Sequence, residues 1–271
     1  MNDRIGKFIN VGSSSLGNAF YIELKLENSD EPFGLLLDCG FKYEKIASSL
    51  NEYGKGMQDV NAILVTHKHN DHSIALKEMV NRGKRVFAPL TTFNFHGLKV
   101  EDRFVIKALN RKSIVDGLSV LPIPLDHQDQ DGTYVENYGY VIDIDNDFRI
   151  LYITDTKYIK HNLRPYRADL IIIEANFDIV MMKYTIESSK GFEGKHFERV
   201  FNSHMSVQHT AKWLSNMDLT KTKLIVLMHL SSNSKNAQPF KFKKLIETKL
   251  KSVGKTYIPK IIVAKMNGGF E

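Results

Sequence analysis

Four side chains of the kinds that bind metal ions occur within six consecutive residues. His67, His69, Asp71 and His72 follow a short apolar segment that reads as a buried strand, and a segment with helical periodicity comes next. A loop tethered on both sides can turn these side chains into a cavity, and imidazoles and carboxylates suit borderline divalent ions such as zinc. The spacing lets His67 and His69 face one ion and Asp71 and His72 a second. We therefore predict a metal site rather than a surface cluster of histidines.

Three more residues occur in the same setting. His127, Asp155 and His229 each come after an apolar segment that we predict to be a strand. Polar residues at the carboxyl ends of strands tend to gather into sites. Alone, each would be an ordinary buried polar residue, but together with the first cluster they become candidate ligands. Asp38 and Glu174 also end predicted strands, and we expect them either to accept hydrogen bonds from metal-binding histidines or to serve as turn residues.

The segments around these residues alternate between two patterns. Short apolar runs with turn signals between them predict strands, and two-faced segments predict helices. The predicted strands cover residues 8–11, 19–26, 35–38, 62–66, 85–88, 104–108, 118–125, 138–144, 149–154, 169–174, 224–228 and 260–264, with a turn at 12–17. The predicted helices cover residues 42–53, 74–80, 206–217 (with Ser206 as N-cap) and 240–250. This order suits an α/β fold, a four-layer αββα sandwich, and we expect residues 1–271 to form one domain.

The overall composition is that of a folded protein. Of the 271 residues, 42% are hydrophobic and 25% charged, which disfavours disorder. The apolar runs are far shorter than the roughly 20 residues of a membrane span, and no signal peptide is evident. We therefore expect a cytoplasmic protein that does not associate with membranes. The single cysteine, Cys39, excludes an internal disulfide and reads as a small buried residue rather than a nucleophile.

Lysines concentrate toward the C-terminal end. The formal net charge is +6 at pH 7, and residues 241–265 contain eight lysines against one acid, Glu247. We expect this region either to attract phosphate-bearing partners or to form an ordinary solvated helix face. Three aromatic residues interleave with the lysines. Phe240 is expected in the core, whereas Phe242 and Tyr257 are left open between core packing and stacking on bases.

The run His-x-His-x-Asp-His, followed by a lone histidine, an aspartate and a final histidine, resembles the metallo-β-lactamase superfamily over essentially the whole chain. The resemblance implies two metal ions with three ligands each and a carboxylate that bridges them. The ligands of the first ion, the ligands of the second and the bridge are then, in turn, His67, His69 and His127; Asp71, His72 and His229; and Asp155. An aspartate bridge is typical of the phosphodiesterase and thioester-cleaving branches. Because β-lactamases have a cysteine there, a β-lactam substrate is disfavoured.

A narrower resemblance is to the YycJ/WalJ group of metal-dependent DNA exonucleases. It rests on the stretches 12–18, 37–40, 66–72, 153–156, 173–178, 203–206 and 228–231. The chain departs from the group near the expected substrate side. Phe177 stands where the group usually has histidine, and Ser203-His-Met-Ser-Val207 stands where it usually has Gly-His-Leu-Ser-Asn.

These resemblances imply an enzyme, a metal-dependent hydrolase that uses two divalent ions, Zn²⁺ or Mn²⁺, to cleave phosphodiesters. A hydroxide shared by the two ions would attack phosphorus in line, with Asp71 and His204 as the catalytic residues. We expect His204 at a helix start just before Ser206, where it would offset charge on the phosphoryl oxygens. The alternative is that His204 only caps or packs.

Three functions share this expected centre. The first is a nuclease acting on DNA. The second is a phosphodiesterase for small cyclic nucleotides, as in phage proteins that destroy nucleotide defence signals; such a pocket is often completed by a second subunit, so this hypothesis includes a homodimer. The third is a thioester hydrolase or a regulatory metal-binding protein. The expected partner is therefore a nucleic acid or a nucleotide, and a substrate panel separates the hypotheses.

Overall fold

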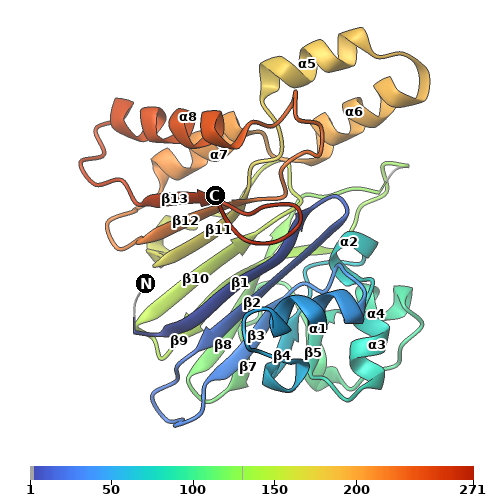
Figure 1. Ribbon diagram of the computed structural model, residues 1–271, viewed down its shortest axis with the longest axis vertical. Helices are drawn as coiled ribbons and strands as arrows, with labels where there is room; N and C mark the ends of the chain where they lie inside the picture. Colours follow the sequence, from blue (N-terminus) through green and yellow to red (C-terminus); the bar gives the residue numbers. More distant parts are fainter. Residues whose placement is uncertain (1–2, 130) are drawn as a thin grey trace.

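Two β-sheets pack face to face in the structure, a computed structural model that describes residues 3–129 and 131–271 (Figure 1). Neighbouring strands of the first sheet are, in order, β1 (Ile5–Ser14), β2 (Gly17–Leu24), β3 (Phe33–Leu37), β4 (Ala62–Leu64), β5 (Val86–Pro89) and β6 (Val105–Ile106). Those of the second sheet are β13 (Lys260–Val263), β12 (Leu224–Met228), β11 (Leu170–Glu174), β10 (Phe148–Ile153), β9 (Asn137–Ile144), β8 (Leu118–Leu125) and β7 (Lys112–Val115). Strands run parallel from β3 to β6 and from β10 to β13.

Helices cover the outer face of each sheet (Figure 1). The helices beside the first sheet are α1 (Tyr43–Asn51), α2 (Asn70–Ser73), α3 (Leu76–Asn81) and α4 (Leu90–Phe95). The helices on the second sheet are α7 (Val207–Asn216) and α8 (Pro239–Ser252). Beyond them stands a helical pair, α5 (Ile179–Ser188) and α6 (Gly191–Ser203). The layers are thus helix, sheet, sheet and helix, which confirms the predicted αββα sandwich.

Alternating side chains along the strands fill three apolar layers. On β10, Ile150 and Tyr152 point between the two sheets, whereas Leu151 and Ile153 point toward α7 and α8. A third apolar cluster lies between the first sheet and its helices. The central strands therefore bury both faces, which explains why they read as near-continuous apolar runs in the sequence.

Each predicted strand is present, and so is the predicted cap of α7, where Ser206 Oγ accepts a hydrogen bond from the backbone nitrogen of His209. The turn predicted at residues 12–17 is largely wrong, because β1 continues to Ser14 and the chain reverses within two residues. The helix predicted at 74–80 corresponds to α3, which begins two residues later at Leu76; the residues just before it form the separate short helix α2. No helix among the described residues is long and apolar enough to cross a membrane.

The prediction that Phe240 lies in the core is wrong. Phe240 is 72% exposed at the start of α8, whereas Phe242 is 2% exposed. The buried face of α8 is formed by Phe242, Ile246 and Leu250, which are four residues apart and share one side of the helix. Phe240 lies off that stripe, so the helix turns it to solvent.

The sequence pattern predicts no element between residues 175 and 205, where the structure has α5 and α6. These helices pack around a small apolar cluster of their own, built on Phe177, Met182 and Phe197. The ring of Phe177 stacks on that of Phe201, with 5.6 Å between the centroids. Phe177, a departure from the YycJ/WalJ pattern, thus lies at the base of this helical pair.

Candidate metal centre

The candidate ligands meet at one edge of the sandwich, where strands of both sheets end. Asp38 and His67 follow β3 and β4 of the first sheet, whereas His127, Asp155 and His229 follow β8, β10 and β12 of the second. Asp38, Asp155 and His229 have left-handed backbones, with φ of 58°, 51° and 52°. This conformation is uncommon for residues other than glycine. The chain therefore turns sharply at these three strand ends.

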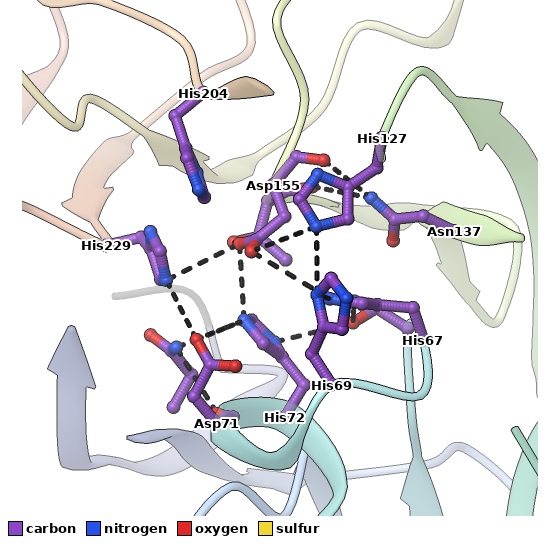
Figure 2. A network of polar contacts seen from close by, with 12 residues as sticks. His67, His69, Asp71, His72, His127, Asn137, Asp155, His204 and His229 are labelled. Carbon is purple, nitrogen blue, oxygen red and sulfur yellow. Dashed lines mark hydrogen bonds and ion pairs between the residues drawn. The ribbon is translucent and has the colours of Figure 1, made fainter. Parts of the chain in front are cut away.

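One group of donor atoms consists of three imidazole nitrogens and a carboxylate oxygen (Figure 2). His69 Nδ1 lies 3.1 Å from His67 Nε2 and 3.0 Å from His127 Nε2. Asp155 Oδ2 lies 3.9 Å from His67 Nε2 and 3.8 Å from His127 Nε2. The four side chains that the sequence assigns to the first ion thus surround one point.

A second group lies on the other side of Asp155. His72 Nε2 is 3.2 Å and His229 Nε2 is 3.6 Å from Asp155 Oδ1. Asp71 Oδ2 closes the group at 3.4 Å from His229 Nε2 and 3.6 Å from His72 Nε2. The side chains assigned by the sequence to the second ion are therefore also together.

Asp155 joins the two groups, because each of its carboxylate oxygens faces a different one. The residue is 2% exposed, and Thr154 Oγ1 donates to its Oδ1 at 2.6 Å. Asn137 Nδ2 donates to the backbone oxygen of Asp155 at 2.8 Å, which holds the strand end in place. Sequence reasoning missed Asn137, whose only signal is a polar residue at the start of an apolar strand.

Asp38 orients the His72 ring of the second group. Its Oδ2 accepts hydrogen bonds from His72 Nδ1 and from the Tyr152 hydroxyl, both at 2.7 Å, and its Oδ1 accepts from the backbone nitrogen of Thr66 at 2.8 Å. Two residues later, Gly40 lets the metal-binding loop approach closely, since a Cβ there would lie 1.7 Å from the Asp71 carbonyl oxygen. Asp38 therefore has the orienting contact, one of the two roles left open for it.

Glu174 supports two imidazoles at the rim of the centre. His204 Nδ1 donates to Glu174 Oε1 at 2.6 Å, and His229 Nδ1 lies 3.3 Å from the same oxygen. The rings of His204 and His229 stack with 5.1 Å between their centroids. His204 lies just before the start of α7, as predicted, two residues ahead of the Ser206 cap; the structure adds that it also directly follows the last residue of α6. The extended link between two helices aims its ring at the centre (Figure 2).

A residue that the sequence did not single out, Asp129, orients one of the histidines of the first group. Asp129 Oδ1 accepts a hydrogen bond from His69 Nε2 at 2.7 Å, and Asp129 Oδ2 accepts one from Lys68 Nζ at 2.6 Å. His127 Nδ1, in contrast, is buried without a hydrogen-bond partner among the residues described. Asp129 is two residues after His127, so nearness to a candidate ligand was its only signal.

Burial and charge move the pKa values of the histidines in opposite directions. Burial lowers the pKa of His127 to about 3, and burial with the neighbouring imidazoles lowers that of His67 well below its ordinary range. Burial also lowers the pKa of His229, but nearby carboxylates, Asp155 first, overcome this effect and raise it to about 10. Without metal, His229 thus keeps a proton at neutral pH, which a cation bound there must displace.

This donor set fits divalent metal ions. In each group, ligand atoms from four side chains lie within 4.8 Å of one another, and all are imidazole nitrogens or carboxylate oxygens. Imidazole nitrogens that converge at 3.0–3.1 Å are stabilised by a cation at their common point. The residues present can therefore hold two such ions, with Asp155 between them.

A cavity of about 870 Å³ opens above the two groups. Candidate ligands from both groups line it, together with His204. Its lining also includes His196 and Arg199 of α6, which the sequence did not connect with the centre. His196 does not follow a strand, so its position in the sequence gives no sign of a place at the centre.

The family of the chain follows from a family model described as the beta-lactamase superfamily domain. It matches residues 34–230, a span that contains every candidate ligand. The chain belongs to the beta-lactamase superfamily. As a superfamily member with a metallo-β-lactamase fold, it is a metal-dependent hydrolase.

Relatives within the superfamily are distant. Exodeoxyribonuclease WalJ of Streptococcus pneumoniae is 24% identical over 239 residues, which cover 84% of this chain and 82% of the relative. Exodeoxyribonuclease YycJ of Bacillus anthracis is 22% identical over 259 residues, 91% of each chain. The solved structure of Zn²⁺-bound PqqB from Methylobacterium extorquens has a TM-score of 0.63 at 14% identity, and covers 97% of this chain and 99% of the other. This structural likeness shows the shared fold.

Proposed function

We propose that this superfamily hydrolase is a phosphodiesterase, and specifically a nuclease acting on DNA. The observation that carries the proposal is the buried Asp155 carboxylate, whose two oxygens face two separate ligand groups. A carboxylate shared by two ions suits phosphodiester hydrolysis, where one ion acts on the attacking oxygen and the other on the leaving oxygen. The two exodeoxyribonuclease relatives support DNA as the substrate.

In this proposal the chain supplies seven metal ligands and the partners that orient them. The ligands are His67, His69, Asp71, His72, His127, Asp155 and His229. Bound Zn²⁺ or Mn²⁺ would lower the pKa of water in the cavity and polarise a phosphoryl oxygen. The carboxylates of Asp38, Asp129 and Glu174 hold the histidine rings in fixed orientations.

Two residues act on the substrate itself in this proposal. His204 donates through Nδ1 to Glu174, which leaves its other nitrogen for an oxygen of the scissile phosphate. Asp71 is more open than the other carboxylate of the centre, with a side chain 22% exposed against 2% for Asp155. This side chain would be open to the cavity, and in this proposal it would accept the proton of an attacking water as well as contribute a ligand oxygen.

The test is a substrate panel with a matched variant. End-labelled single-stranded and duplex DNA, cyclic mononucleotides and a thioester are each incubated with wild type, Asp155→Asn and Asp102→Asn, in Zn²⁺ or Mn²⁺. We expect cleavage of DNA from its ends, a loss of more than roughly 100-fold in Asp155→Asn, and no loss in Asp102→Asn, whose side chain is exposed and does not line the cavity. DNA left intact by the wild type with both metals would reject the proposal.

A second candidate substrate is a small cyclic nucleotide. The cavity volume of about 870 Å³ lies in the range of small-ligand pockets, so it does not require a polymer. Turnover of cyclic mononucleotides with DNA left uncut would replace the nuclease by this activity. Native mass measurement during that assay would show whether the active species is a homodimer.

A further inference from the structure

One helix outside the metal centre forms a wall of the cavity. The cavity-lining residues of α6 include Glu193, His196, Phe197 and Arg199. The apolar cluster between α5 and α6 contains Phe197, so the same residue lines the cavity and anchors the helix. The face of α6 that carries His196 and Arg199 is therefore held against the substrate space by packing.

Arg199 is the permanent positive charge of this wall. Among the described residues that line the cavity there is no other arginine or lysine, whereas Asp129, Asp131 and Glu193 add negative charge outside the ligand groups. None of the described carboxylates forms an ion pair with Arg199; its Nη2 instead donates to His196 Nδ1 at 3.3 Å. A guanidinium without a carboxylate partner can bind a phosphate through two parallel hydrogen bonds.

The length of α6 separates this guanidinium from the reacting bond. His204, aimed at the ligand groups, directly follows the helix, and Arg199 precedes it by five residues. Five helical residues rise about 7.5 Å. If His204 meets the scissile phosphate, Arg199 stands farther along the cavity, where the next phosphate of the same strand would lie.

We propose that Arg199, held by His196, forms a subsite for the phosphate next to the scissile one. The inference rests on the proposed phosphodiesterase function and narrows its substrate to strands with at least two phosphates. Arg199 is then a residue for substrate choice, while the ligand groups and His204 act on the bond that breaks.

Three short substrates separate a neighbouring phosphate from the scissile one. The dinucleotide TpT has only the scissile phosphate, whereas pTpT and TpTp add one phosphate on the 5′ or the 3′ side. We expect Arg199→Gln to raise the KM of one phosphorylated dinucleotide roughly 10- to 100-fold, the loss expected for a charged hydrogen bond, and the KM of TpT less than about threefold. Arg199→Lys, which keeps the charge without the planar fork, should fall in between.

The matched control is Lys195→Gln, which removes a positive charge from the same helix at an exposed position outside the cavity lining. Its KM ratios should equal those of the wild type. Equal KM increases for all three substrates in Arg199→Gln would place the guanidinium at the scissile phosphate and overturn the proposal. KM values that equal those of the wild type for all three substrates would overturn it as well.

Binding measurements keep the subsite separate from the proposed activity. Fluorescein-labelled pTpTpT is titrated into wild type and Arg199→Gln, with circular dichroism as the check on folding. Weaker binding by the variant, with a salt dependence reduced by about one phosphate contact, supports the subsite even if the wild type cleaves nothing. Equal affinity and equal salt dependence would reject the subsite while leaving the phosphodiesterase proposal to its own test.

Discussion

Single carboxylates determine how the histidines of the centre are aimed. Three histidines each donate a hydrogen bond through one ring nitrogen to a different carboxylate, at 2.6–2.7 Å. The pairs are His72 with Asp38, His69 with Asp129 and His204 with Glu174. For His72 and His69 this contact leaves the other nitrogen to face a ligand group. Fixing the tautomer in this way raises the basicity of a ligand and removes rotational freedom before any ion binds. The aiming of the rings is therefore a property of the residues behind them.

Asp38→Asn is predicted to weaken metal binding by about 10- to 100-fold. An amide has one acceptor oxygen, so it cannot accept from Thr66 on one side and from both His72 and Tyr152 on the other. Competition with a chelating dye measures the affinity, and elemental analysis measures the metal content. Asp102→Asn is the control, and equal affinity in the two variants would contradict the orienting role of Asp38.

At the scale of elements, the α5–α6 pair is attached to the sandwich and yet packs around its own apolar cluster. Phe177 is 1% exposed within that cluster, and Phe192 on the same pair is 89% exposed. Hydrogen bonds join the base of the pair to the sandwich: Asp178 N and Thr185 Oγ1 donate to Asn236, and Gln208 Nε2 donates to Asp178 Oδ2. Elements that rest on a small separate cluster open more readily than the central sheets.

We predict that Phe177→Ala loosens α5 and α6 without unfolding the sheets. Removing a buried phenylalanine ring typically costs about 3–5 kcal/mol, and here the loss falls on the helical pair. Hydrogen exchange followed by mass spectrometry should show faster exchange at residues 179–203 and unchanged protection in β10 to β12. Phe192→Ala should resemble wild type within roughly 0.5 kcal/mol. Loss of protection across all strands would show that the pair does not open by itself.

The sequence predicted the strands and the ligand set for one physical reason. Strands buried on both faces appear as apolar runs, and polar residues such as His67, Asp155 and His229 then stand out at their ends. α5 escaped prediction because apolar residues lie all around it: Val180 is 70% exposed and Met182 is buried. The roles of residues such as Asn137 and Arg199 depend on contacts between distant segments, which no local pattern encodes.

At the scale of the whole molecule, the two ligand groups connect the sheets. The first group takes His67 from the first sheet and His127 and Asp155 from the second, and the second group also draws on both. An ion bound to either group therefore holds the open edge of the sandwich together. An ion that binds the folded chain but not the unfolded chain stabilises the folded state by mass action.

Chelation is accordingly predicted to lower the thermal midpoint. At a free metal concentration 100-fold above the dissociation constant, binding is worth about 2.7 kcal/mol, which corresponds to roughly 5–10 °C for a chain of this size. Differential scanning calorimetry with EDTA, and again after Zn²⁺ or Mn²⁺ is restored, measures the shift. Asp155→Asn should respond less. An identical midpoint with and without metal, with removal verified by elemental analysis, would mean that the ions do not connect the sheets.

The left-handed turns at Asp38, Asp155 and His229 limit which amino acids can replace these residues. Asparagine and glycine tolerate such a backbone, whereas β-branched residues do not, and alanine carries a penalty of its own. An alanine scan would therefore overstate the worth of the side chain at these positions, but not at Asp71, which lies in a helix. Natural variation at the three turns should be confined to a few residue types even in superfamily members that have lost activity, because the backbone selects them independently of the metal.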